Sequence, residues 1–246
     1  MALNYQQFVC KKAPLPHYNQ RKHPIEMLVI HSMAHSAEEG IHRLDELQLS
    51  THYVVDYNGT IYNCVEEENR AWQAGISSWR GLSDINSRSI GIEVCHRTLG
   101  QSAFGNKQIK SLCLLCRQII ERWHISPEMI VGHSDIAPLR KPDPGKAFPW
   151  KALADENIGI WYGNNSSNEK NIAKMLSQIG YDTSSELAIN ASLYAFCRHF
   201  LPSKIKTMPV KLLLNHPYPK DCSYLFKDND ILCALQNIYA QYYVHK

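Results

Sequence analysis

Apolar residues fall into short uninterrupted runs in the first half of the chain. Residues 27–31 and 89–95 combine apolar and β-branched side chains, which is typical of strands buried on both faces. An Asn-Gly pair separates residues 51–56 from residues 60–65, and such a pair is a strong signal for a β-hairpin. The pattern therefore predicts two interior strands and a hairpin in one domain.

Two other stretches have the spacing of amphipathic helices. In residues 106–124 apolar side chains recur every three or four positions, and residues 36–47 begin with acidic residues that stabilise a helix N-terminus. Strands interspersed with amphipathic helices are typical of α/β domains. We therefore expect an α/β fold with a mixed central sheet flanked by helices, followed by a small all-α C-terminal domain.

Composition divides the chain into four parts. Residues 1–24 are polar and contain prolines, which indicates an N-terminal arm, and residues 25–162 hold the predicted catalytic domain. Residues 163–168, with the sequence GNNSSN, form a polar linker. The remainder, residues 169–246, is predicted to be helical over three segments: 169–178, 185–200 and about 230–244.

Side chains that can bind a metal ion or take part in catalysis are most concentrated in residues 131–145, with the sequence VGHSDIAPLRKPDPG. The prolines of this segment disfavour regular structure, so we predict a loop. His133 follows a short apolar run, Asp143 lies between two prolines, and Lys141 precedes Asp143 by two residues. An imidazole and a carboxylate suit a zinc ion, but two ligands do not make a site.

His31 is the best candidate for a third ligand because it closes the buried run at residues 27–31. Glu93 lies inside the other buried run, where a carboxylate is costly unless it is paired, protonated or functional. A single histidine is more often structural than functional. It is the combination of His31 with the polar loop and with Glu93 that favours a site.

Five segments of the chain resemble the type 2 N-acetylmuramoyl-L-alanine amidases, in the order and spacing of that family. The family includes a cytosolic anhydromuropeptide amidase and an outer-membrane lipoprotein amidase of Gram-negative bacteria, and it is related to the peptidoglycan recognition proteins. The chain most resembles the lipoprotein amidase, because its C-terminal region is similar to a small helical peptidoglycan-binding domain. The five segments, which span roughly residues 20–160, are VIHSM, LSTHYVVDYNGTIY, RAWQAG, NSRSIGIEVCH and GHSDIAPLRKPDPGKAFPW.

The resemblance implies an activity, hydrolysis of the amide bond between N-acetylmuramic acid and L-alanine in peptidoglycan or its fragments. It implies one Zn²⁺ per chain, with Glu93 as the catalytic acid/base and Lys141 as the residue that stabilises the oxyanion. The implied zinc ligands are His31, His133 and Asp143. The predicted substrate contacts are Ser32, His52, Trp72, Gln73 and Asn86.

The chain departs from the family pattern at two positions. Gln73 replaces the usual His of an AWHAG segment, and Leu139 replaces the usual Gly of an APGRK segment. Gln73 belongs to a cleft segment and not to the zinc ligands, so we expect altered substrate contacts and retained activity. Leu139 is expected to alter the path of the loop just before Lys141.

Two other functions stay open at this point. Proteins of this fold can act as peptidoglycan recognition proteins without catalysis, although the three ligands and Glu93 favour an enzyme. Ser167 and Lys170 have the Ser-x-x-Lys spacing of serine-type D-alanyl carboxypeptidases, but such short motifs arise easily by chance. For the C-terminal helices, the alternative is a hairpin that packs on the catalytic domain and binds nothing.

Charge and composition restrict the partners and the location. The 246 residues include 26 basic and 23 acidic ones, a balance that does not favour nucleic acid, and no stretch has the length of a transmembrane segment. The N-terminus lacks the apolar core of a signal peptide, so a periplasmic or cell-envelope location follows from the resemblance alone and a cytoplasmic one stays open. The eight cysteines show no disulfide framework, and Cys113 and Cys116 are expected to be core residues of a helix.

Overall fold

The central element is a six-stranded mixed sheet. The structure, a computed structural model, describes residues 10–243. Strands follow the order β1-β5-β4-β7-β3-β8, in which β4 and β5 are antiparallel and all other neighbours are parallel. The strand bounds are β1 Cys10–Lys12, β3 Met27–Met33, β4 Tyr53–Val55, β5 Ile61–Asn63, β7 Ser89–Cys95 and β8 Ile130–Gly132. A separate antiparallel pair consists of β2 (Tyr18–Gln20) and β6 (Asn69–Ala71).

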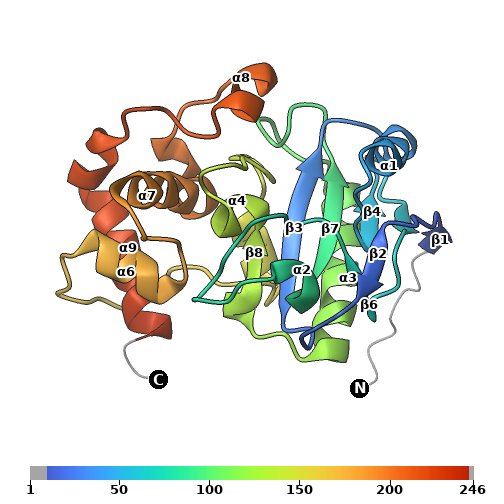
Figure 1. Cartoon of the computed structure of the whole chain (residues 1–246). Coiled ribbons are helices and arrows are strands. Elements are labelled where there is room, and N and C mark those ends of the chain that lie inside the picture. Colours follow the sequence, from blue (N-terminus) through green and yellow to red (C-terminus); the bar gives the residue numbers. More distant parts are fainter. Residues whose placement is uncertain (1–9, 244–246) are drawn as a thin grey trace.

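Strands β3 and β7 lie side by side in the middle of the sheet (Figure 1). Helix α3 (Asn106–Trp123) lies behind this sheet in the view of Figure 1, and the short helix α2 (Ile85–Arg88) lies in front of it. Because both faces are covered, the two strands carry continuous apolar runs and not an alternating pattern. As expected, Cys113 and Cys116 are buried residues of α3.

The predicted strands and helices are confirmed with shifts of a few residues at their ends. Helix α1 (Ala37–Glu46) begins at a capping box between Ser36 and Glu39. The prediction of a loop throughout residues 131–145 is wrong in its first part, because β8 extends to Gly132 and helix α4 (His133–Ile136) follows directly. The Asp135 carboxylate accepts a hydrogen bond of 2.7 Å from the Gly132 backbone N–H, which stabilises the start of this short helix.

The described part of the predicted N-terminal arm is extended and fastened to the α/β domain. Strand β1 pairs with β5, and β2 pairs with β6. Arg21 donates hydrogen bonds of 2.8 Å to the backbone oxygens of Glu67 and Ser87. Residues 1–9 of the arm lie outside the described residues.

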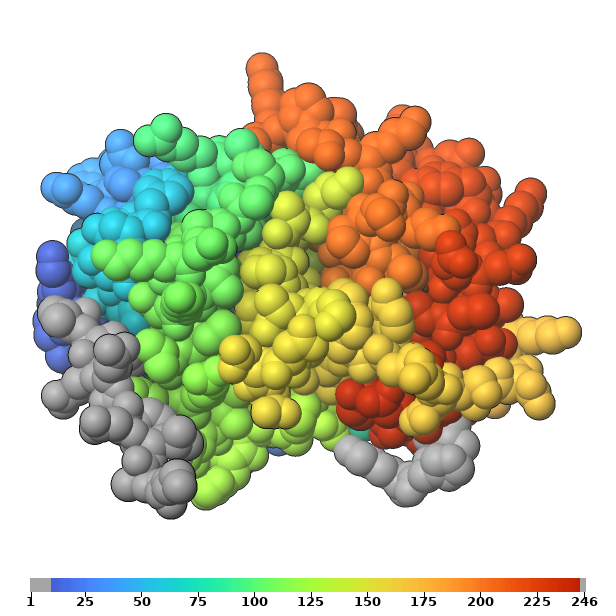
Figure 2. Space-filling view, turned by 180° about the vertical axis from the view of Figure 1, so that it is seen from behind, coloured from blue at the N-terminus to red at the C-terminus, as the bar shows by residue number. Residues whose placement is uncertain are grey.

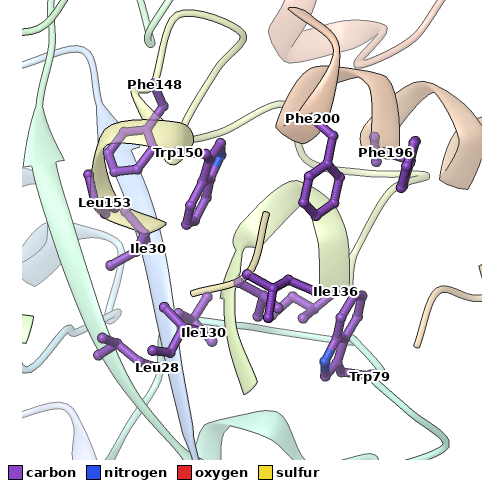
Figure 3. Packing of buried hydrophobic residues seen from close by; sticks show 14 of the residues in the cluster. Leu28, Ile30, Trp79, Ile130, Ile136, Phe148, Trp150, Leu153, Phe196 and Phe200 are labelled. Atoms are coloured by element: carbon purple, nitrogen blue, oxygen red, sulfur yellow. The ribbon is translucent and has the colours of Figure 1, made fainter. Parts of the chain in front are cut away.

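The C-terminal part is helical and packs against the sheet domain. Trp79 meets Tyr181 edge to face at 5.0 Å, and the ring of Trp150 stacks on His199 at 3.9 Å. Figure 3 shows Trp150 and Ile136 facing the helix that carries Phe200, within one continuous cluster of buried apolar residues. The division into a catalytic and a binding domain stays a prediction. Helix α5 (Trp150–Asp155) precedes the predicted linker, and the helices after it are α6 Ile172–Ile179, α7 Glu186–Phe200, α8 Val210–Asn215 and α9 Asn229–Tyr242.

The predicted linker, residues 163–168, is held against helix α9. The Asn237 carboxamide accepts a hydrogen bond of 2.7 Å from the backbone N–H of Gly163 and donates one of 2.8 Å to its carbonyl oxygen. The view from behind shows the yellow residues around 150–165 lying between the green sheet domain and the orange and red helices (Figure 2). Within residues 10–243, no helix is both long enough and apolar enough to cross a membrane.

Candidate active site

Three side chains from neighbouring elements meet at the carboxyl ends of the parallel strands. His31 lies near the end of β3, His133 begins α4 directly after β8, and Asp143 follows in the next turn. Strand β3 pairs with both β7 and β8, so the fold places these strand ends at one edge. His31 also lies opposite Glu93 in the register of β3 and β7.

The three side chains present a donor set that suits a metal ion. The Nδ1 atoms of His31 and His133 are 2.9 Å apart, and Asp143 Oδ2 lies 3.4 Å from the first and 3.1 Å from the second. Each of the three residues is buried, and their potential ligand atoms all lie within 4.8 Å of one another. Two imidazoles and one carboxylate match the ligand sets of catalytic zinc sites, which leave a fourth position open.

Burial and the close charges shift the pKa values of this cluster. Burial alone disfavours a charged His31, but its hydrogen bond to Asp143 and the nearby Glu93 raise the pKa of its ring. Burial lowers the pKa of His133 to about 4. Burial likewise opposes an ionised Asp143, but His133 and His31 outweigh it and hold the pKa of this carboxyl well below its usual range. The protein therefore favours an ionised Asp143 and a neutral His133.

Glu93 is the unsatisfied carboxylate of the site. Its Oε1 lies 4.0 Å from His31 Nδ1, while Oε2 is buried and has no hydrogen-bond partner among the described residues. Burial raises the pKa of Glu93 to about 7. A carboxyl group with this pKa can exchange protons near neutral pH.

A cleft of about 320 Å³ opens over these residues. Both Glu93 and Lys141 line it together with His133 and Asp143, so the structure brings the predicted catalytic residues to one place. Leu139 is 37% exposed, and the loop that contains it still delivers Lys141 to the cleft. The helical part contributes Leu214 of α8 to the cleft wall.

The predicted substrate contacts divide into two groups. Ser32, Trp72 and Gln73 line the cleft. His52 is fully buried, and its Nδ1 accepts a hydrogen bond of 3.0 Å from the Gly91 backbone N–H. Asn86 is also buried, and its side-chain oxygen accepts hydrogen bonds from two backbone N–H groups. The structure therefore does not place His52 and Asn86 in the wall of the cleft, and their expected role as substrate contacts stays a prediction.

Gln73 does more than line the cleft. Its side-chain oxygen accepts a hydrogen bond from Nε2 of His31. The expectation of altered substrate contacts stays a prediction, and this hydrogen bond adds a direct contact with His31. No sequence pattern could reveal this contact, because it depends on how the loop after β6 crosses the sheet.

Arg140 is a functional candidate that the sequence reasoning did not single out. It lines the cleft beside Lys141, and its guanidinium donates a hydrogen bond of 3.1 Å to the Ala74 carbonyl oxygen. The sequence did offer one indication of a role for Arg140, its position in the segment 131–145 that also contains His133, Lys141 and Asp143.

The Ser-x-x-Lys pair gains no support from the geometry. Ser167 Oγ accepts a hydrogen bond of 3.1 Å from the Glu169 backbone N–H, and the side chain of Lys170 is exposed. Neither residue lines the cleft that holds the His, Asp and Glu cluster.

Comparison with known proteins agrees with the site. The profile of the N-acetylmuramoyl-L-alanine amidase family, Amidase_2, matches residues 21–146. The amidase AmiD of Escherichia coli is 37% identical over 209 residues, which cover 73% of this chain and 76% of AmiD. The 1,6-anhydro-N-acetylmuramyl-L-alanine amidase AmpD of Haemophilus influenzae is 32% identical over 165 residues, covering 58% of this chain and 89% of AmpD.

Solved structures give the same result. Escherichia coli AmiD in complex with the substrate anhydro-N-acetylmuramic acid-L-Ala-D-γ-Glu-L-Lys superimposes with a TM-score of 0.71 at 30% identity, covering 89% of this chain and 90% of AmiD. AmpDh3 of Pseudomonas aeruginosa gives a TM-score of 0.73 at 25% identity, and the superposition covers 98% of this chain and 99% of AmpDh3. The predicted fold class and the predicted enzyme class are confirmed. The chain belongs to the N-acetylmuramoyl-L-alanine amidase family.

Proposed function

We propose that this protein is a zinc-dependent hydrolase of the amide bond between N-acetylmuramic acid and L-alanine in peptidoglycan or its fragments. The observation that carries the proposal is the cluster of His31, His133 and Asp143 beside a cleft that Glu93 also lines, where Glu93 Oε2 has no hydrogen-bond partner among the described residues. The family match and the likeness to AmiD in complex with an anhydro-muropeptide support the substrate class.

The three ligands fit zinc by their chemistry. His133 Nε2 lies 3.1 Å from the Ala74 carbonyl oxygen, which can only accept, so in the neutral ring the hydrogen resides on Nε2 and the lone pair on Nδ1. This lone pair points toward His31 Nδ1 and the Asp143 carboxylate, a crowding of acceptors that a cation would relieve. Zinc bound there would lower the pKa of a water molecule and polarise the scissile carbonyl.

Glu93 and Lys141 perform the remaining chemistry in this proposal. Glu93 accepts the proton of the attacking water and passes it to the leaving amine of L-alanine, for which a pKa of about 7 is well suited. Lys141 stabilises the negative charge that develops on the carbonyl oxygen. Trp72 and Ser32 provide contact surface for the substrate along the cleft.

We also propose an envelope location and a peptidoglycan-binding role for residues 169–246. The first is supported by the cell-wall substrates in the names of the relatives, and the second by the contribution of α8 to the cleft wall. Fractionation of the host cell tests the location. Co-sedimentation of the zinc-free protein with purified sacculi tests the binding role, because hydrolysis is then excluded.

Mass spectrometry of a disaccharide-tetrapeptide incubated with the protein tests the reaction. We expect free disaccharide and a peptide that begins with L-alanine, no products in the presence of a zinc chelator, and full recovery when zinc is added back. Retained zinc without any cleavage would instead identify a recognition protein. Loss of a terminal D-alanine alone would identify the carboxypeptidase activity at Ser167 and Lys170.

A further inference from the structure

Gln73 is held in a single orientation on the floor of the site. Its Nε2 donates a hydrogen bond of 2.8 Å to Ser89 Oγ, and the hydroxyl of Ser89 in turn donates one of 2.6 Å to the Ile85 carbonyl oxygen. Because the single hydroxyl hydrogen of Ser89 is already used, its oxygen can only accept from Gln73. The amide group therefore points its nitrogen at Ser89 and its oxygen at His31.

This orientation determines which nitrogen of His31 carries a hydrogen. The Gln73 oxygen can only accept, so His31 Nε2 must donate to it. In the neutral ring the lone pair then resides on Nδ1, the atom that faces His133 and Asp143. The contact thus selects the tautomer that can bind a metal at the cluster.

The next residue acts on the other histidine in the same way. The Ala74 carbonyl oxygen lies 3.1 Å from His133 Nε2, so the adjacent residues 73 and 74 engage the outer nitrogens of both rings. The Asn86 side-chain oxygen holds this pair in place, because it accepts hydrogen bonds of 3.0 and 2.7 Å from the backbone N–H groups of Gln73 and Ala74.

The strand beneath provides the space for this arrangement. A Cβ atom on Gly91 would lie 2.7 Å from Cγ and 2.9 Å from Cδ of Gln73, closer than real Cβ contacts allow. Only glycine at this position lets the Gln73 side chain lie flat against β7 and reach His31.

We propose that Gln73 is a positioning residue that fixes the tautomer and ring orientation of His31, and that Asn86 holds the segment that does so for both histidines. The inference rests on the proposed zinc site and deepens it. In metal sites generally, loss of such a partner of a ligating histidine weakens metal affinity by about 10- to 100-fold. Gln73 is thus part of the metal-binding apparatus, although it is not itself a ligand.

Zinc titration at one fixed pH in competition with a chromophoric chelator tests the proposal. Gln73→Leu keeps the approximate shape of the side chain but removes the acceptor, so we expect its dissociation constant for zinc to rise by about 10- to 100-fold. Gln73→Glu keeps an acceptor toward His31, so we expect it to bind zinc within about threefold of the wild type. The matched control is Gln178→Leu, the same change at an exposed position of α6, which should leave zinc affinity unaltered.

A second measurement does not depend on affinity. In the zinc-loaded protein with ¹⁵N-labelled histidine, the Nε2–H proton of His31 should resonate downfield in the wild type and in Gln73→Glu, and shift upfield or broaden in Gln73→Leu. Equal zinc affinity and an unmoved Nε2–H signal in a folded Gln73→Leu protein would overturn the positioning role alone. Failure of the wild type to bind zinc would overturn the proposed function as well.

Discussion

Asp135 and Asp143 lie in the same short segment, residues 131–145, and both are buried beside a histidine. Asp143 lines the cleft and contacts His31 and His133. Asp135 faces the helical part of the chain and contacts His199 at 2.8 Å. The two aspartates are thus alike in burial and in having a histidine neighbour, and they differ in their other hydrogen-bonding partners.

Asp135 is surrounded by donors. Its Oδ1 accepts a hydrogen bond of 2.8 Å from the Tyr181 hydroxyl, and its Oδ2 accepts one of 2.7 Å from the Gly132 backbone N–H and one from His199 Nδ1. A buried carboxylate with three donors is satisfied, so its role is to tie the helical part to α4. Because α4 begins with His133, this contact also anchors an element of the candidate metal site.

The Asp143 cluster is instead rich in acceptors. Gln73 and Ala74 engage the outer nitrogens of both histidines, so the two neutral rings would direct their lone pairs at each other and at the Asp143 carboxylate. Glu93 Oε2 has no partner among the described residues. The comparison teaches that the balance of donors and acceptors, and not burial or residue type, separates a structural Asp–His pair from a candidate metal site.

Substitution of Glu93 should produce the largest effect and tests the cleft side of the comparison. Glu93→Gln keeps the shape of the side chain but cannot accept a proton, so we expect kcat/KM to fall by about 10²- to 10⁴-fold. Zinc content should stay unchanged, since Glu93 is not one of the three ligands. Muropeptide hydrolysis and metal analysis of the same preparation measure both quantities.

Glu38→Gln, the same change at an exposed position of helix α1, is the matched control and should retain full activity. A Glu93→Gln protein with wild-type turnover would remove Glu93 from the mechanism. Loss of zinc together with activity would indicate that Glu93 acts as a ligand.

Substitution Asp135→Asn tests the Asp135 contact with the helical part and should lower the stability of the protein. A carboxamide has one acceptor oxygen and no negative charge, so Asp135→Asn weakens the hydrogen bonds from Gly132 and His199 and forces the Tyr181 hydroxyl to accept where it now donates. We expect the free energy of unfolding to fall by about 2 kcal/mol, a typical value for the loss of hydrogen bonds to a buried charged group. Denaturant unfolding followed by tryptophan fluorescence measures the change.

The control for this substitution is Asp155→Asn. Asp155 is exposed and forms a surface ion pair of 2.8 Å with Lys151, so its loss should cost at most about 0.5 kcal/mol. Equal effects of the two substitutions would contradict the assignment of Asp135 as the contact that anchors the helical part.

The sequence was informative where a feature depends on local pattern. The apolar runs predicted β3 and β7 because both strands are buried on both faces, and His31 followed from its place at a strand end. Helix α4 escaped prediction because it has only four residues in a proline-rich segment, and its Asp135 is held by Tyr181 and His199 from the helical part of the chain. The partners of His31 and His52 escaped for the same reason, since Gln73 and Gly91 reach them from distant segments.

The buried His52 allows the same comparison to be made for a histidine. It should have an effect of no greater size on the free energy of unfolding, and one that depends on pH. Its ring is fully buried, with Nδ1 accepting from the Gly91 N–H and Nε2 lying 3.1 Å from the Asn69 carbonyl oxygen, and burial lowers its pKa to about 3 from the ordinary 6.5. Between these values the unfolded chain binds a proton that the folded protein does not, so the stability from a neutral His52 is present above pH 6.5 and is lost as the pH falls. The loss from this one group should reach about 2 kcal/mol at pH 5.

The variant His52→Gln removes this titration. It should be less stable than the wild type at pH 8, because the Gly91 N–H loses a well-placed acceptor, but its stability should fall by about 2 kcal/mol less between pH 8 and pH 5. His42→Gln, at an exposed position of α1, should leave the pH profile of unfolding unchanged. Parallel profiles for wild type and His52→Gln would show that His52 titrates normally in the folded protein and would remove His52 from the comparison.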